Sequence, residues 1–220
     1  MERPFDAELK KLRNELMNMT DLIEKAVSKA VKSFIVNDRS MAESVIKNDI
    51  DIDKIDLEIE ENCLKLIALY QPAGKDLRFI TMSMQIRIDL ERIGDLAVDI
   101  CDETMKLDKK DINFTDDLKI LYEKSIKMVK DAVSSFISRD PELAKEVWNS
   151  DDAVDALNSK IIDNSIKHMV EHGKNIKSLT SLIAVSRCLE RVADHATNVA
   201  EDVVYMYKGE IIMHSRELKK

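Results

Sequence analysis

The sequence predicts an all-α protein built as two tandem three-helix bundles, and three observations lead to this prediction. Glycine and proline are scarce, with 4 Gly and 3 Pro in 220 residues, which leaves little material for tight turns. Charged residues make up 35% of the chain and aromatic residues only 5%, a composition typical of long helices. Finally, a pattern roughly one hundred residues long occurs twice, which indicates a duplicated unit.

The repeat is clearest in two acidic motifs. The segment Leu90–Asp95 (LERIGD) corresponds to Leu189–Asp194 (LERVAD), 99 residues later. Upstream, Val31–Ile35 (VKSFI) corresponds to Val133–Ile137 (VSSFI), 102 residues later. The second unit is therefore shorter by three residues. The predicted boundaries are 1–107 for the first bundle, 116–212 for the second and 106–117 for the linker.

Capping and turn residues divide each unit into three helices. Ser40 with Glu43 predicts a capping box at the start of the second helix, and Asp140 before Pro141 predicts the start of the fifth. Glycines mark further breaks or helix ends at Gly74, Gly173 and Gly209. The predicted helices span residues 6–37, 40–70, 75–105, 117–139, 141–172 and 176–208.

Each third helix carries an apolar stripe in steps of three and four residues, which predicts burial against neighbouring helices. In the first unit the stripe comprises Ile86, Leu90, Ile93, Ala97 and Ile100. In the second unit it comprises Leu182, Val185, Leu189, Val192, Ala196, Val199 and Val203. Because short hairpins make neighbouring helices antiparallel, we expect two up-down-up bundles side by side in an elongated molecule.

Acidic side chains lie opposite each stripe. At 100° per residue from the centre of the first stripe, Glu91, Asp95 and Asp99 fall at about 160°, 200° and 240°. The third helix of the second unit, 176–208, repeats this arrangement with Glu190, Asp194 and Asn198. Stacked like charges destabilise a helix unless something offsets them, so we expect a compensating charge at each motif.

A second acidic pair repeats together with these motifs. Asp49 and Asp53 in the second predicted helix correspond to Asp151 and Asp155 in the fifth. Counting outward from the hairpins places Asp49 at the level of Asp95. The same count pairs Asp53 with Glu91, Asp151 with Asp194 and Asp155 with Glu190. The count predicts the level of each carboxylate along the helices but not the direction in which it points.

Carboxylates gathered at one level form an oxygen-only site, which suits hard or intermediate cations. Iron, manganese, magnesium, calcium or zinc ions are the candidates. Neither the Glu-x-x-His spacing of di-iron bundles nor the H-E-x-x-H motif of zinc hydrolases occurs. The predicted metal ligands are Glu91, Asp95, Asp99, Asp49, Asp53, Glu190, Asp194, Asn198, Asp151 and Asp155.

The simpler alternative is that these acidic faces are solvated. Their counter-charges would then come from Arg87, Arg92, Arg187 and Arg191. His195 lies about 60° from the apolar stripe, which favours a partly buried structural histidine over a metal ligand.

Charge and motif content exclude several classes of function. The net charge of -8 argues against nucleic acid or an anionic membrane surface as a partner. Three widely spaced cysteines favour a reducing compartment, and the charged N-terminus is unlike a secretory signal, so we expect a cytoplasmic protein. No nucleophile with a base and no phosphate-binding glycine loop occurs, so we do not expect an enzyme.

With both acidic motifs and the start Phe5–Leu9 (FDAEL), the chain resembles the PhoU family over almost its whole length. Its segments Asp89–Asp95 and Leu189–Asn198 are similar to the paired acidic signatures of that family, although Asp99 replaces the usual Asn. The resemblance implies a negative regulator of phosphate transport and of phosphate-starvation signalling that carries metal ions. It implies as partners the ATPase of a phosphate ABC transporter and a sensor histidine kinase. Contact with the membrane would be made only through partners.

Other interpretations remain at this point. A homodimer is expected of such a bundle, but one sequence assigns no interface. A metal-free helical scaffold that docks a basic partner surface is the main alternative to a metal-binding regulator. The third interpretation is a metal-dependent phosphohydrolase, for which the carboxylates are the only supporting feature.

Overall fold

The computed structural model describes residues 3–107, 115–173 and 175–208, and these residues form helices joined by short connections. The helices are α1 Pro4–Val36, α2 Arg39–Asn48, α3 Ile50–Tyr70, α4 Gly74–Lys106, α5 Thr115–Ser138, α6 Pro141–His172 and α7 Ile176–Lys208. No strand occurs among the described residues, so the predicted all-α class is confirmed.

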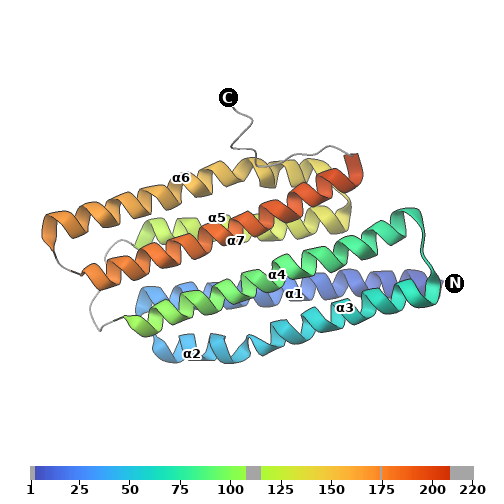
Figure 1. Cartoon of the computed structure of the whole chain (residues 1–220), viewed down its shortest axis with the longest axis horizontal. Coiled ribbons are helices and arrows are strands. Elements are labelled where there is room, and N and C mark those ends of the chain that lie inside the picture. Colours follow the sequence, from blue (N-terminus) through green and yellow to red (C-terminus); the bar gives the residue numbers. More distant parts are fainter. Residues whose placement is uncertain (1–2, 108–114, 174, 209–220) are drawn as a thin grey trace.

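The predicted helices agree with the observed ones to within two residues at each end, with one exception. The predicted second helix, 40–70, is interrupted at Asp49, where α2 ends and α3 begins. The backbone of Asp49 is still helical, but its carbonyl oxygen accepts from the amide of Ile52 at 2.8 Å, a bond over three residues that tightens the turn. Figure 1 shows the change of direction between α2 and α3, whereas α6 continues unbroken through the equivalent Asp151.

The predicted capping box at Ser40 and Glu43 is wrong. The N-cap of α2 is Asp38, whose carboxylate accepts from the Met41 amide at 3.0 Å, because the helix begins at Arg39. In the second unit the predicted cap is confirmed, since Asp140 accepts from the amides of the second and third helical residues.

The predicted linker, 106–117, was too long at both ends. Lys106 still belongs to α4, and α5 already begins at Thr115 because Asp116 and Asp117 provide the negative charge that favours a first helical turn. Residues 108–114 lie outside the described residues, as does the predicted helix end at Gly209.

The helices form two three-helix bundles lying side by side (Figure 1). α1, α2–α3 and α4 form the first unit, and α5, α6 and α7 the second. The two units meet where α1 and α4 contact α5 and α7. Across this seam the rings of Phe79 and Phe136 stack at 4.7 Å, and Lys130 pairs with Glu24 at 2.7 Å. The two bundles therefore share one continuous apolar core.

Both predicted apolar stripes are buried. Each stripe residue of α4 is 0% exposed, and the stripe of α7 is at most 1% exposed. Within the described residues, no helix is both long and apolar enough to cross a membrane.

Candidate functional site

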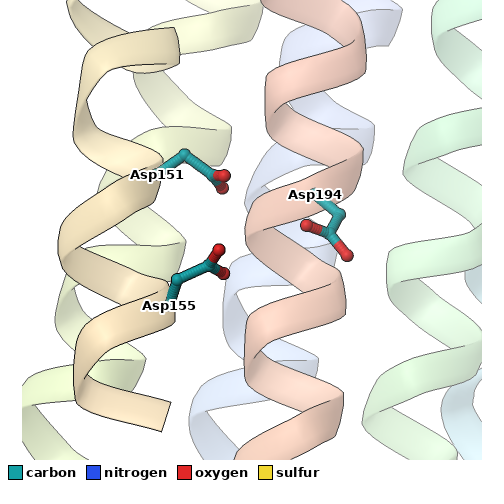
Figure 2. A group of neighbouring side chains, drawn as sticks. All are labelled: Asp151, Asp155 and Asp194. Atoms are coloured by element: carbon teal, nitrogen blue, oxygen red, sulfur yellow. The ribbon is translucent and has the colours of Figure 1, made fainter. Parts of the chain in front are cut away.

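Three carboxylates of the second unit converge between α6 and α7. Asp151 and Asp155 lie four residues apart on α6, which places them on one face of the helix, one turn apart. Asp194 comes from α7, and ligand oxygens of the three residues lie within 4.8 Å of one another. Figure 2 shows the two α6 side chains directed towards α7. We call these three residues the second acidic group.

Burial differs within the second acidic group. Asp151 is only 2% exposed, Asp155 is half-buried and Asp194 is exposed. The hydroxyl of Thr197 lies 3.3 Å from Oδ1 of Asp151 and donates to it, while also lying 3.0 Å from the carbonyl oxygen of Ala193. The group therefore runs from a buried carboxylate outward to the surface of the bundle.

This donor set fits a hard cation. Three negative charges within a few ångströms repel one another strongly where one of them is removed from water. A bound cation would offset that repulsion, and carboxylate oxygens are the ligands that magnesium, calcium, manganese and iron accept. Asp151, Asp155 and Asp194 are the residues that would hold such an ion.

The first unit places its matching carboxylates close together as well. Burial raises the pKa of Asp49, and the charges of Asp53 and Asp95 raise it further. Burial also raises the pKa of Glu91, followed by the charge of Asp95. Asp49, Asp53, Glu91 and Asp95 thus form a first acidic group between α3 and α4.

A glycine allows the helices of the first unit to approach at this group. A Cβ atom on Gly94 would lie 3.5 Å from Oδ1 of Asp49 and 3.2 Å from the side chain of Ile52. The second unit carries Ala193 at the equivalent position, where it is fully buried. Gly94 therefore leaves space for Asp49 and Ile52 that a side chain would occupy.

In the first acidic group, an arginine compensates part of the negative charge. Arg92 pairs with Asp95 at 2.9 Å and with Glu91 at 3.5 Å, so part of the negative charge is compensated within α4. Within the described residues, three potential ligands gather inside 4.8 Å only in the second acidic group. The two groups are alike in position but differ in spacing.

Three of the predicted ligands are not part of these two groups. Glu190 is half-buried one turn before Asp194 on α7 and lies outside the 4.8 Å group. Asn198 donates instead to Oδ1 of Asp89 on α4, at 3.4 Å. Asp99 lies near enough to Cys188 on α7 that its charge, after burial, raises the pKa of that thiol to about 11. Asp99 and Asn198 therefore face the seam between the units.

Asp89 is a polar residue of the seam that the sequence analysis did not single out. Its Oδ1 lies 2.9 Å from Nδ1 of His195, and the two side chains are only 14% and 20% exposed. The prediction that His195 is partly buried is thereby confirmed. The partners are 106 residues apart in sequence, and the position equivalent to Asp89 in the second unit is Cys188, so the repeat gave no signal.

The sequence model of the PhoU domain matches this chain twice, over residues 16–104 and 118–203. The chain belongs to the PhoU family. Each match contains one of the two acidic groups, so the duplicated unit and the PhoU domain coincide.

PhoU proteins of known sequence and structure resemble the chain over nearly its whole length. It is 37% identical over 214 residues to a phosphate-specific transport system accessory protein PhoU homolog of Aquifex aeolicus, covering 97% of each chain. A Thermotoga maritima relative, PhoU homolog 1, is 33% identical over 207 residues, covering 93% of this chain and 89% of the relative.

Two crystal structures of PhoU proteins share the fold. PhoU from Pseudomonas aeruginosa superimposes with a TM-score of 0.87 at 33% identity, over 94% of this chain and all of the other. The phosphate transport system regulatory protein PhoU from Streptococcus pneumoniae gives 0.88 at 28% identity, over 95% and 99% of the two chains. The tandem arrangement of two three-helix bundles is thus the arrangement of PhoU structures.

Proposed function

We propose that this PhoU-family chain is a non-catalytic regulatory adaptor of phosphate-specific transport that restrains phosphate uptake and phosphate-starvation signalling. Its relatives carry the names of accessory and regulatory proteins of that transport system, which supports the role. The proposed partners are the transporter ATPase and a sensor histidine kinase. The adaptor would act in the cytoplasm as a homodimer.

We further propose that the adaptor binds a metal ion at the second acidic group. The observation that carries this proposal is the convergence of Asp151, Asp155 and Asp194, one of them buried, within 4.8 Å. Removing a carboxylate from water is unfavourable unless an opposite charge or hydrogen bonds replace the water. A cation held by oxygens from α6 and α7 would satisfy this group and fix the two helices relative to each other.

Elemental analysis of protein purified without chelator tests the metal. We expect bound metal in the parent and its loss when Asp151, Asp155 and Asp194 are all replaced by Asn. The matched control replaces Asp116, Asp152 and Asp163 by Asn, an equal charge change at exposed positions of α5 and α6. Equal metal content in all three proteins would refute the proposal.

The first acidic group favours the alternative role for that face, a metal-free surface that docks a basic partner. Arg92 compensates part of its charge without a cation. Capture of the transporter ATPase distinguishes the two roles. Capture that survives chelation but weakens when Asp53 and Glu91 are replaced by Asn and Gln would assign the first face to direct docking.

A further inference from the structure

α4 begins and α7 ends at the same end of the molecule (Figure 1). Residues at these two helix ends line a basic pocket, away from both acidic groups. Its volume is about 240 Å³, and it opens to the surface. The residues that line it are Lys75 and Arg78 of α4, Arg139 between α5 and α6, and Met206 and Tyr207 of α7. The pocket thus receives residues from both units.

Arg13 of α1 adds a fourth positive charge beside the basic pocket. Its guanidinium lies 5.0 Å from the centre of the Phe79 ring, and its Nε atom is buried without a hydrogen-bond partner. Burial raises the pKa of Tyr207, and the charges of Arg139, Arg13 and Arg78 oppose that rise. Three guanidinium groups therefore lie within electrostatic reach of one tyrosine hydroxyl, in a chain whose net charge is -8.

Ion pairing does not compensate these four cations in the described part of the chain. Within the described residues, none of the four forms an ion pair or a hydrogen bond to an acidic side chain. Of the acidic residues close in sequence, Asp140 accepts through Oδ1 from two amides at the start of α6. Among the described residues, the cations of the basic pocket therefore repel one another without an ion-pair partner.

The backbone of Arg139 is strained in a way that its repeat equivalent avoids. Arg139 has φ 61° and Asn37, 102 residues earlier, has φ 53°, and each amide donates to a phenylalanine carbonyl at 3.3 Å. Asn tolerates this left-handed conformation better than most residues, and Arg does not share that preference. Arg139 directly follows α5, where left-handed residues are common, and its side chain lines the pocket.

We propose that the basic pocket binds a phosphate-type oxyanion, either inorganic phosphate or the terminal phosphate of a monoester. Guanidinium groups present paired N–H donors that match phosphate oxygens, and a lysine supplies a further point charge. A tetrahedral anion has acceptors in several directions, which suits cations that converge from three elements. This proposal is independent of the metal at the second acidic group.

Such an anion would connect the two units. Arg13, Lys75 and Arg78 belong to the first unit, whereas Arg139 and Tyr207 belong to the second. A ligand held by both sets stabilises the packing of one bundle against the other. Occupancy of the basic pocket would therefore affect the packing at the seam. α4 and α7 run from this end of the molecule towards its middle, where they carry the acidic motifs.

Calorimetric titration of the full chain tests this proposal, with chelator present so that the outcome does not depend on metal. We expect inorganic phosphate to bind and to raise the melting temperature by mass action. We expect Arg139→Asn to weaken binding by roughly tenfold or more, the loss of a charge-assisted contact. Because Asn37 occupies the equivalent turn, this variant should fold with an unchanged or higher melting temperature in the absence of phosphate.

Lys124→Gln provides the matched control, because this exposed lysine lies about 20 Å from the pocket along α5. It should bind phosphate as the parent does. Tighter binding of adenosine monophosphate than of phosphate would assign a monoester as the ligand, and the reverse would assign the free anion. Sulfate that binds as tightly as phosphate would overturn the proposal. So would an acidic peptide that binds to the protein when phosphate produces neither heat nor a shift in melting temperature.

Discussion

At the scale of single residues, Asp151 shows how this chain sacrifices stability at its acidic group. A fully buried position on α6 would ordinarily be apolar, as are the buried residues Val147 and Val154 on the same helix. Instead it holds a carboxylate within 4.8 Å of two others. Under the proposed metal binding, this position would serve the ion rather than the stability of the fold.

Replacing Asp151 by Asn should therefore separate stability from binding. In the presence of chelator, we expect the free energy of unfolding of the variant to be about 1 kcal/mol higher than that of the parent, because one of three repelling charges is gone. With metal present, the parent should gain stability and the variant should gain much less. Thermal unfolding with and without metal measures both effects. Asp152→Asn, an exposed neighbour, should change neither, and an Asp151→Asn protein stabilised by metal as strongly as the parent would contradict the assignment.

Asp202 is a second residue whose charge is disfavoured by the fold. Burial, followed by the charges of Asp89 and Glu201, raises the pKa of its carboxyl to about 6. A carboxyl whose pKa is raised on folding contributes stability at low pH, and this contribution is lost as the pH rises through about 6. The ionised form at neutral pH thus opposes folding.

We therefore expect Asp202→Asn to raise the free energy of unfolding at pH 8 by up to about 3 kcal/mol, and to change it little near pH 4. Urea unfolding at several pH values measures this difference. An effect of the substitution that is the same at every pH would show that the carboxyl titrates normally in the folded protein.

At the scale of the helical elements, the start of α2 depends on one cap. Asp38→Ala should destabilise the protein by about 1 kcal/mol, because the Met41 amide loses its acceptor. Ser40→Ala and Glu43→Ala should each have little effect, since both residues lie exposed within the helix. Urea unfolding of the three variants checks this order, and a larger loss for Ser40→Ala than for Asp38→Ala would restore the capping box.

Most helix ends could be predicted because their signals are local. Asp140 before Pro141 and the left-handed Gly173 act within a few residues, and both marked true ends of α6. The interruption at Asp49 could not be predicted, because no proline or glycine occurs there and the same pattern in α6 continues unbroken. It reflects tertiary packing, where Gly94 brings α4 close to Asp49 and Ile52.

The acidic groups were only partly predictable for a related reason. Counting from the hairpins placed Asp151 and Asp194 at one level because the connections are short and the helices antiparallel. The angles of the side chains around each helix were measured from the apolar stripe of its own bundle. They therefore could not show which side chains face the other bundle. Asp99 and Asn198 turn towards that other bundle, and the contact between His195 and Asp89 exists only after the two units pack.

At the scale of the whole molecule, the seam makes the two bundles one cooperative structure. Phe79 and Phe136 are at most 1% exposed and stack on each other across it. Truncation of either ring leaves a cavity that borders both units. A core shared in this way couples the unfolding of the two bundles.

We expect Phe79→Ala to destabilise the chain by about 3 to 5 kcal/mol, the usual loss for a buried phenylalanine. The single tryptophan, Trp148, belongs to the second unit and reports on it alone. Its fluorescence midpoint in urea should shift as far as the midpoint by circular dichroism, although the substitution is in the first unit. A Trp148 midpoint equal to that of the parent would show that the bundles unfold independently.

Two positions of the repeat meet each other twice at the seam. In one contact the first unit supplies the first position, and in the other contact the second unit supplies it. Asp89 meets Asn198, and their equivalents Cys188 and Asp99 lie near each other across the seam. This is the arrangement of a symmetric dimer, in which one position on a subunit faces another on its copy and the reverse contact follows automatically. A gene half as long would thus have encoded a self-associating ancestor, and fusion of two copies freed each contact to diverge. Asp89 and Cys188, no longer bound to be identical, show that divergence at the centre of the interface.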